Sequence, residues 1–316
     1  MIDSYGRKIN YLRVSVTKRC NLNCSYCGAC NERDSAELTA EQIEKIVRVF
    51  ADFGINKVRL TGGEPLVRHD ICDIAKRISR IDGVKKLALT TNGIRLGELA
   101  RPLKESGVSA INISLDTTDE RQYKALTGFD GLQKVFEGIA ECERVGLSPI
   151  RLNAVLIKGQ NDSQAESLIN IARDRKIDVR FIELMPFSDE GENEKLVIRG
   201  EDILKQFPFL KAVPSDKTDF EKSVARYYEA EGFKGRIGFI TPISDKFCSE
   251  CNRIRLLCDG KVKACLGNDE VIDLMDVIDN EELLRERIKE AILSKPPEHK
   301  FSCEYGKNHG LNRIGG

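Results

Sequence analysis

Three cysteines near the N-terminus have the spacing of metal ligands. Cys20, Cys24 and Cys27 form a C-x3-C-x2-C pattern, and Tyr26 precedes the third cysteine. Three thiolates this close together suit a soft metal or an iron–sulfur cluster. A structural zinc site normally has four protein ligands, whereas a 4Fe-4S cube held by three cysteines keeps one iron open to a small molecule. Cys30 lies three residues further along, so a four-cysteine zinc site is an open alternative.

A second cysteine group lies in the C-terminal third of the chain. Cys248 and Cys251 form a CxxC pair, and Cys265 follows after thirteen residues. Asp259-Gly260 between them is a hairpin turn signal, so Cys251 and Cys265 are predicted to face each other across a hairpin. This group again offers three ligands for a metal or a cluster.

Two arginines lie within that hairpin. Arg253 and Arg255 are two residues apart on the predicted strand and share one face, opposite Ile254. Two guanidinium groups beside a metal site form a clamp suited to phosphate oxygens. The alternative is a solvent-exposed basic strand face.

Composition excludes several classes of protein. The chain has 316 residues, with 50 Lys+Arg and 50 Asp+Glu, so its overall charge does not attract nucleic acid or an anionic membrane. Its N-terminus has no apolar signal-peptide core, and no apolar run is long enough to span a membrane. Eleven cysteines in a chain of this length indicate thiolate chemistry in a reducing compartment. We therefore expect a cytoplasmic protein without nucleic-acid or membrane partners.

Strand and helix patterns alternate through the first two thirds of the chain. A capping box at Thr39–Gln42 opens a helix through about residue 53, and further helices are expected from about 70, near 97–106, near 131–145 and from 162 to about 175. The six predicted strands are 11–17, 57–61, 86–90, 109–115, 151–157 and 179–185. Six such units predict an α/β fold with a parallel sheet, an open three-quarter (β/α)6 barrel related to the TIM barrel.

Unusual short motifs follow several of these strands. GGEP, TTNG, SLD and ELMP, like the first cysteine loop, each lie where a strand ends. Because ligands bind at the carboxyl edge of parallel sheets, these motifs are predicted to converge on one site.

The pattern changes after the sixth strand. An acidic loop over 187–197, a helix near 200–207 and short strands at 226–230 and 236–241 indicate a smaller α+β region. We predict a barrel domain over 1–220 and a C-terminal domain over 221–316 that carries the second cysteine group and ends in Gly-Gly.

Nearly the whole chain resembles one enzyme family. RCNLNCSYC, RLTGGEP, LTTNG, NISLD, VLIKGQND, RFIELMPF, FCSECNRIRL and the terminal IGG are similar to motifs of the GTP 3′,8-cyclases, the molybdenum cofactor biosynthesis protein A family. This family belongs to the radical S-adenosylmethionine (SAM) superfamily, to which the first cysteine motif alone would point.

The resemblance implies roles for individual residues. Cys20, Cys24 and Cys27 would hold a 4Fe-4S cluster that binds and reduces SAM, and Cys248, Cys251 and Cys265 would hold a second 4Fe-4S cluster that binds the guanine of GTP. The implied SAM contacts are Tyr26, Gly63, Ser114 and Met185, with Glu64 in the same lining. The implied GTP contacts are Arg13, Arg59, Thr90, Arg151, Arg253, Ile254 and Arg255. The implied catalytic residues are Arg13, Arg253, Arg255, Gly315 and Gly316, although a Gly-Gly end is otherwise read as a frayed tail.

The resemblance also implies a reaction and partners. A 5′-deoxyadenosyl radical from SAM would remove the ribose 3′ hydrogen of GTP, and the product would be (8S)-3′,8-cyclo-7,8-dihydro-GTP, in the first step of molybdenum cofactor biosynthesis. The implied partners are an electron donor of unknown identity, cyclic pyranopterin monophosphate synthase as the next enzyme, and a second copy of the chain in a homodimer.

Three positions depart from the family pattern. Gly28-Ala29 stands where Met-Pro is usual, Cys30 is an additional thiol, and Arg151 stands where Lys is more common. The rival interpretations are a radical SAM enzyme that modifies a peptide, a zinc-binding interaction protein and a nucleic-acid-binding iron–sulfur protein. The arginines beside the second cysteine group disfavour a peptide-modifying enzyme. The net charge of zero and the absence of Trp from the sequence disfavour a nucleic-acid-binding protein.

Overall fold

A single sheet organises the computed structural model, which describes residues 1–27, 37–187, 194–214 and 224–301. The sheet has twelve strands in the order β12-β11-β10-β1-β2-β3-β4-β5-β6-β9-β8-β7. Gly28, Ala29, Cys30, Gly315 and Gly316 lie outside the described residues, so the predictions made for them stay predictions.

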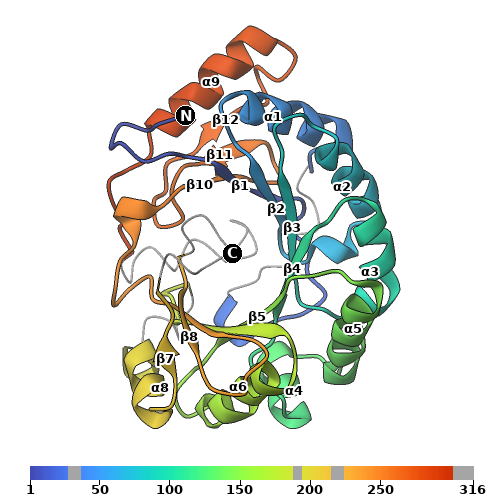
Figure 1. Ribbon diagram of the computed structural model, residues 1–316. Coiled ribbons are helices and arrows are strands. Elements are labelled where there is room, and N and C mark those ends of the chain that lie inside the picture. The colour runs from blue at the N-terminus through green and yellow to red at the C-terminus, as the bar shows by residue number, and fades with distance from the viewer. Residues whose placement is uncertain (28–36, 188–193, 215–223, 302–316) are drawn as a thin grey trace.

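The six predicted parallel strands are confirmed. Each pairs in parallel with the next along the chain, as expected when every connection passes over the sheet through a helix. They are β1 (Tyr11–Ser15), β2 (Lys57–Thr61), β3 (Lys86–Thr91), β4 (Ala110–Ser114), β5 (Ile150–Val155) and β6 (Ile177–Ile182). Figure 1 shows them curving around one side of the molecule.

Strands from the C-terminal part extend both edges of this sheet. β10 (Arg253–Leu256) pairs in parallel with β1, and β9 (Ile237–Ile240) pairs in parallel with β6. Antiparallel strands then complete the two ends: β11 (Lys261–Lys263) and β12 (Ile272–Asp273) at one, β8 (Arg226–Glu229) and β7 (Lys211–Ala212) at the other. In the described part of the chain β9 and β10 are not paired, so the barrel is open. The predicted boundary at residue 220 falls in an undescribed stretch between β7 and β8.

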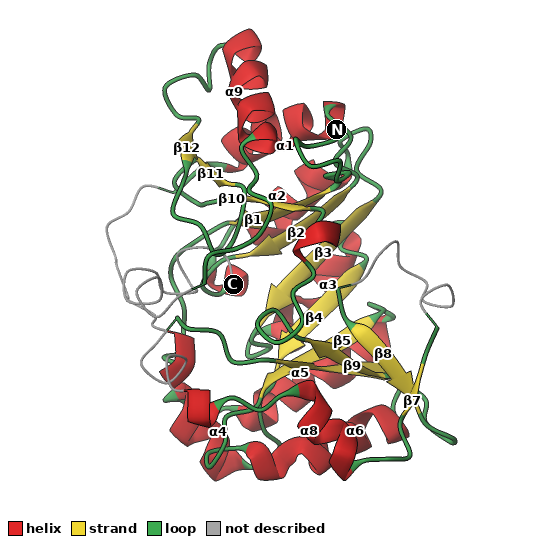
Figure 2. Cartoon of the chain, turned by 90° about the vertical axis from the view of Figure 1, so that its left-hand side faces the viewer, coloured by secondary structure: helices red, strands yellow, loops and turns green. Residues whose placement is uncertain are grey.

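Helices cover the outer surface of the parallel strands (Figure 1). They are α1 (Ala40–Asp52), α2 (Ile71–Ser79), α3 (Leu96–Glu105), α4 (Glu120–Thr127), α5 (Leu132–Val145), α6 (Ala165–Asp174), α8 (Gly200–Gln206) and α9 (Glu281–Leu293). Short 3-10 turns are η1 (Ser25–Cys27), η2 (Pro65–Val67), η3 (Asp162–Gln164), η4 (Glu194–Leu196) and η6 (Cys248–Glu250). Figure 2 shows α9 beside α1 at one end of the sheet. None of the described helices is long and apolar enough to cross a bilayer.

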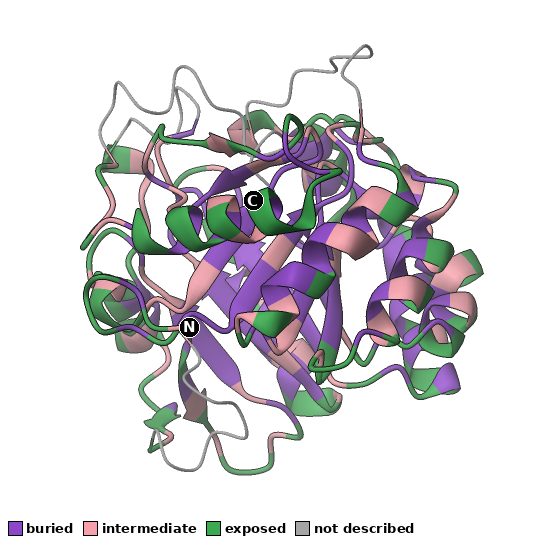
Figure 3. Cartoon of the chain, turned by 90° about the horizontal axis from the view of Figure 1, so that it is seen from above, coloured by how far each residue is buried: buried purple, intermediate pink, exposed green. Residues whose placement is uncertain are grey.

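The capping box predicted for α1 is present. The Thr39 hydroxyl accepts a hydrogen bond from the Gln42 backbone, and the Gln42 side chain accepts one from the Thr39 backbone. Ile43, Ile46 and Phe50 of this helix are fully buried against the sheet. Figure 3 shows the same division throughout: strands are largely buried, while helices present an exposed outer face.

Two helices, α4 and α9, lie in stretches for which no element was predicted. The segment EELLRERIKEAIL of α9 is rich in charge, but its Leu284, Ile288 and Ile292 recur every four residues and are all buried. Asn280 caps its first turn by accepting a hydrogen bond from the backbone of Leu283. A narrow apolar stripe within many charges is a weak helix signal until its packing partner is known.

We predict different stability costs for two Phe→Ala substitutions. Phe50 is fully buried, so Phe50→Ala should lower the free energy of unfolding by about 3–5 kcal/mol through loss of burial and a residual cavity. Phe209 is 49% exposed, so Phe209→Ala should cost about 1 kcal/mol or less. Urea unfolding of the metal-free proteins, followed by circular dichroism, measures both. Equal costs would contradict the packing described for α1.

Candidate active site

A cavity of about 510 Å³ lies on the inner side of the sheet. Each of the parallel strands, β10, β1 to β6 and β9, contributes at least one lining side chain. Because side chains alternate along a strand, one face of each strand points into the cavity while the other packs under the helices. The polar residues of the predicted strands therefore gather in one place.

The cavity lining carries a large excess of positive charge. Two carboxylate residues, Asp116 and Glu298, line it together with ten cationic residues. The cationic residues are Arg7, Arg13, Lys57, Arg59, Lys85, Lys86, Arg180, Arg253, Arg255 and Lys295. The net charge of zero for the whole chain thus conceals a local site for a polyanion.

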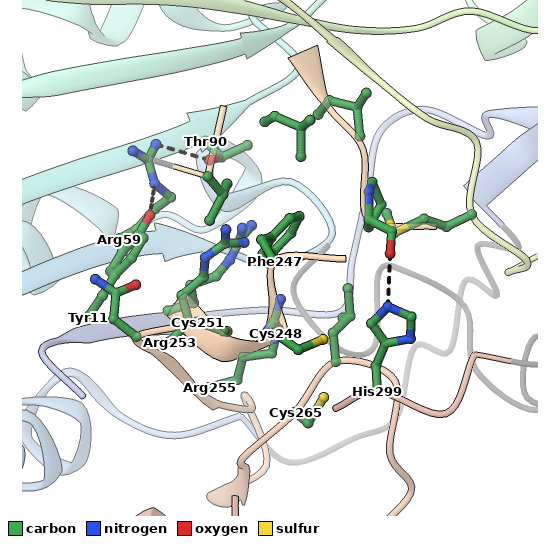
Figure 4. A pocket seen from close by; sticks show the side chains of 18 of the residues that line it. Tyr11, Arg59, Thr90, Phe247, Cys248, Cys251, Arg253, Arg255, Cys265 and His299 are labelled. Atoms are coloured by element: carbon green, nitrogen blue, oxygen red, sulfur yellow. Dashed lines mark hydrogen bonds between the residues drawn. The ribbon is translucent and has the colours of Figure 1, made fainter. Parts of the chain in front are cut away.

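The second cysteine group belongs to this cavity. Cys248, Cys251 and Cys265 all line it and all have free thiols, and Figure 4 shows them around Arg253 and Arg255. Although burial alone would raise the pKa of Cys251, the positive charges of Lys295 and Arg253 lower it to about 7. This thiol is therefore close to its thiolate form, which is the form that binds metal.

The two hairpin arginines, Arg253 and Arg255, each have a hydrogen-bond donor without an acceptor among the described residues. Within the described residues, Nη2 of Arg253 and Nε of Arg255 are buried without a hydrogen-bond partner. Arg255 is only 5% exposed, and its pKa is lowered by burial and by the charge of Arg253. Buried charged donors without acceptors are costly, which indicates an anionic ligand at this position.

A tyrosine holds Arg59 in the same wall. Nε of Arg59 donates to the Tyr11 hydroxyl, and Nη1 donates to Thr90 Oγ1 at 3.3 Å (Figure 4). Tyr11 and Lys57 are partners in strand register, and the Lys57 ammonium lies 4.3 Å from the centre of the Tyr11 ring. Although burial raises the pKa of Tyr11, the charges of Arg59, Lys57 and Arg13 outweigh it and lower this pKa to about 7.

The arginines of β5 and β6 differ in position. Arg180 lines the cavity and donates from Nε and Nη2 to Asn153 Oδ1 at 3.0 and 2.7 Å. Arg151 is 4% exposed, lies outside the cavity lining, and has its Nε 3.8 Å from a carboxylate oxygen of Asp178. Asp178 also pairs with Arg236 at 3.0 Å, so part of the Arg151 charge is balanced inside the protein.

The first cysteine loop follows β1 and is held by a glycine turn after β2. The Gly63 backbone donates to the Thr17 carbonyl at 2.8 Å. A Cβ added at Gly63 would lie 2.4 Å from the Arg19 carbonyl oxygen and 2.6 Å from that of Lys18. Only glycine allows this close approach of the two backbones, which explains the GG of the GGEP motif.

Glu64 organises the loops around the cysteines rather than lining the cavity. Its carboxylate accepts hydrogen bonds from the Leu66 backbone (2.9 Å), the Thr91 hydroxyl (2.7 Å) and the Asn92 backbone (2.6 Å). The Asn92 side chain donates in turn to Asn21 Oδ1 in the cysteine loop at 2.8 Å. Burial raises the pKa of Glu64 to about 7 despite these hydrogen bonds. The GGEP and TTNG motifs are therefore hydrogen-bonded to each other and together support the first cysteine loop.

Three of the four residues predicted to contact SAM share the cavity lining with Asp116. Tyr26, Ser114 and Met185 line the cavity, and the Tyr26 hydroxyl donates to Asp116 Oδ2 at 2.7 Å. The Val155 backbone donates to the other carboxylate oxygen at 2.8 Å. Burial raises the pKa of Asp116 to about 6. The cavity thus connects residues of the first cysteine loop with the second cysteine group.

Both cysteine groups have the donor set of an iron–sulfur cluster. Burial raises the pKa of Cys20 and of Cys24, and the neighbouring charges of Asp116, Cys27 and Cys20 raise that of Cys24 further. Because raised pKa values disfavour the thiolate form, three neighbouring thiolates at this site would need a positively charged group between them. In the described part of the chain no three His, Cys, Asp or Glu side chains converge on one metal ion. A cluster does not require such convergence because each cysteine binds a different iron.

Some predicted site residues lie outside the cavity lining. They are Cys20, Cys24, Cys27, Gly63, Arg151 and Ile254. Ile254 is 1% exposed and packs in the hydrophobic core, because it lies on the opposite strand face from Arg253 and Arg255. Its side chain therefore faces away from the cavity.

Other lining residues were missed from the sequence. Lys57 is two residues before Arg59 on the same strand, and Arg180 alternates with buried Val179 and Phe181, so the strand periodicity contained both signals. Lys295 follows α9 and has no comparable signal.

Comparison with known proteins identifies two families along the chain. Residues 14–172 match the radical SAM superfamily, and residues 177–301 match the family described as Molybdenum Cofactor Synthesis C. The GTP 3′,8-cyclase of Alkaliphilus oremlandii is 44% identical over all of both chains. That of Peptoclostridium acidaminophilum is 41% identical over all of this chain and 98% of its own.

Solved structures share the fold at lower identity. Streptococcus suis SuiB bound to S-adenosylmethionine is 18% identical with a TM-score of 0.61, over 86% of this chain and 65% of SuiB. SuiB bound to its precursor peptide SuiA gives a TM-score of 0.62 over 93% of this chain and 75% of SuiB. These likenesses support the partial barrel. The two matched families and the full-length relatives show that this chain belongs to the GTP 3′,8-cyclase family of the radical SAM superfamily.

Proposed function

We propose that this chain is a radical SAM lyase that converts GTP to (8S)-3′,8-cyclo-7,8-dihydro-GTP in molybdenum cofactor biosynthesis. One observation carries the proposal at the level of the site. A single cavity is lined by Tyr26, Ser114 and Met185 on the side of the first cysteine loop, by the second cysteine group, and by ten cationic residues. Guanosine triphosphate and S-adenosylmethionine fit this combination of charge and chemistry.

Two 4Fe-4S clusters are part of the proposal. Cys20, Cys24 and Cys27 would hold one, and Cys248, Cys251 and Cys265 the other. When bound with SAM, the first cluster supplies the electron that cleaves SAM into methionine and a 5′-deoxyadenosyl radical. Tyr26, Gly63, Ser114 and Met185 would position SAM, and Glu64 would hold the turns after β2 and β3 beside the first cysteine loop.

The cationic wall would bind the triphosphate. The proposed contributors that line the cavity are Arg13, Arg59, Thr90, Arg253 and Arg255 from the sequence prediction, together with Lys57 and Arg180. Arg151, which was also predicted, lies outside the lining and would act on the triphosphate only from behind it. The unpartnered donors of Arg253 and Arg255 lie beside the second cysteine group, so they would hold the nucleotide there. Fixing the substrate in this enclosed site also keeps water away from a reactive carbon radical.

The atoms of the reaction balance as an isomerisation. C3′ of GTP loses one hydrogen atom, which ends on 5′-deoxyadenosine, and forms a bond to C8 of guanine. One electron from a low-potential donor and one proton then complete the base. Product and GTP have the same composition.

Several further assignments belong to the proposal. They are a cytoplasmic location, a homodimer, transfer of the product to cyclic pyranopterin monophosphate synthase, the division into domains 1–220 and 221–316, and a catalytic role for Gly315 and Gly316. The two family matches meet between residues 172 and 177, so the boundary at 220 rests on the sequence pattern alone. Family membership supports the other assignments, and the nature of the electron donor is left open.

The test is an anaerobic assay of the iron- and sulfide-reconstituted protein with SAM, a strong reductant and GTP. We expect 5′-deoxyadenosine and a GTP isomer in equal amounts, separated by chromatography because their masses do not distinguish substrate from product. Formation of 5′-deoxyadenosine with unchanged GTP would reject GTP as substrate. A colourless protein that retains zinc would reject the iron–sulfur assignment.

Arg255→Ala should strongly reduce cyclisation without preventing SAM binding. Removing one partner from a buried charged contact costs about 2–5 kcal/mol, so kcat/KM for GTP should fall roughly 30-fold or more. Steady-state kinetics and a SAM-binding assay measure the two effects. Arg48→Ala, on the exposed face of α1, is the matched control and should behave as wild type. Unchanged turnover in Arg255→Ala would remove this residue from the site.

Tyr11 should make GTP affinity pH-dependent. Its pKa of about 7 means a neutral phenol below that pH and a phenolate above it. The phenolate neutralises part of the wall formed by Arg13, Lys57, Arg59 and Arg253, so the affinity should fall severalfold as pH rises through 7. GTP itself gains negative charge in this range, which acts in the opposite direction. The comparison with Tyr11→Phe, by calorimetry from pH 6 to 8, isolates the tyrosine: identical profiles would contradict this prediction.

A further inference from the structure

A buried lysine joins the two chain segments that carry the second cysteine group. Lys295 follows the C-terminal end of α9 and is 2% exposed. Its ammonium donates to the carbonyl oxygens of Arg253 and Ala264, each at 2.8 Å. Arg253 is two residues after Cys251, and Ala264 immediately precedes Cys265. The ammonium therefore ties together the two backbones whose separation sets the distance between these cysteines.

The charge of Lys295 has no carboxylate partner in the described part of the chain. Its two hydrogen bonds go to neutral carbonyls, and the charges of Arg7 and Arg255 act on it unfavourably. The favourable charges that act on it are those of Cys251 and Cys265. A buried ammonium is costly unless an anion compensates it, and among the described residues the cysteines with the group they hold are the nearest source of negative charge.

Arg7 provides an instructive contrast. It also donates to backbone near the cysteines, to the Cys248 carbonyl at 2.9 Å and the Pro296 carbonyl at 2.7 Å. However, its Nε forms an ion pair with Asp3 at 2.7 Å, so its charge is balanced within the protein. Unlike that of Arg7, the charge of Lys295 is therefore available to the cysteine group, where it acts on Cys251 together with the charges of Arg253 and Arg255.

We propose that Lys295 is the positioning residue and counter-cation of the cluster held by Cys248, Cys251 and Cys265. This inference rests on the second cluster of the proposed function. Three thiolates give such a cluster a net negative charge, which grows when it is reduced. A fixed positive charge beside it favours the reduced form and so raises its reduction potential.

The experiment measures that potential in the full-length chain. Substituting Ala for Cys20, Cys24 and Cys27 leaves one cluster to be reconstituted, and a redox titration followed by electron paramagnetic resonance gives its potential. In this background we compare Lys295→Gln, Lys295→Met and Lys295→Arg. Lys289→Met, which removes an exposed charge from α9, is the matched control. Iron content and circular dichroism accompany each titration.

We expect Lys295→Gln and Lys295→Met to shift the potential to more negative values, and Lys295→Arg and Lys289→Met to stay close to the parent protein. Folded neutral variants that lose iron, with iron retained in Lys295→Arg, would also support the role. A wild-type potential in Lys295→Gln, or equal loss of iron in all three Lys295 variants, overturns it. If the parent protein itself takes up no cluster, the second cluster of the proposed function fails first and the inference fails with it.

Discussion

Positive charge that the described residues leave largely unneutralised is the constraint on which the rest of this structure depends. Ten cationic residues and two carboxylate residues line one cavity. Burial and mutual repulsion lower the pKa of Arg13 to about 9, and burial lowers that of Lys57 to about 8 and of Arg180 to about 10. Such an arrangement is unfavourable in the empty protein, and it becomes favourable when anionic ligands enter. The cationic lining therefore lowers the stability of the empty protein and favours the binding of anionic ligands.

The sheet makes this arrangement possible because one of its faces packs under the helices and the other lines the cavity. Along β1, Leu12 and Val14 are fully buried under the helices, while Arg13 points into the cavity. Along β2, Val58 and Leu60 are likewise buried, while Arg59 points into the cavity. Backbone pairing and the aliphatic layer hold the strands in place, so the polar layer need not stabilise the fold. The hydroxyl groups of Tyr11 and Thr90 then fix the direction of the Arg59 guanidinium group, and Thr90 does so without cancelling its charge.

The carboxyl edge of the sheet has a different organisation. There the acidic groups are held by hydrogen bonds: Glu64 by the turns after β2 and β3, and Asp116 by Tyr26 and the end of β5. These carboxylates connect loops that are far apart in sequence. They support the first cysteine loop, whose Tyr26 lines the cationic cavity, so this loop and the cavity adjoin each other.

The sequence by itself determined the local features: strand alternation, the helix cap at Thr39, the glycine turn at Gly62-Gly63 and the cysteine spacings, since each depends on residues close together in the chain. Only the tertiary structure decided which of these features become neighbours in space. Arg255 lies in register with Arg13 only because β10 joins the edge of β1. Pairing between strands so distant in sequence follows from packing of the whole sheet, which no local pattern records. For the same reason, only the folded chain brings Lys295 to the second cysteine group and shows that Arg151 faces Asp178.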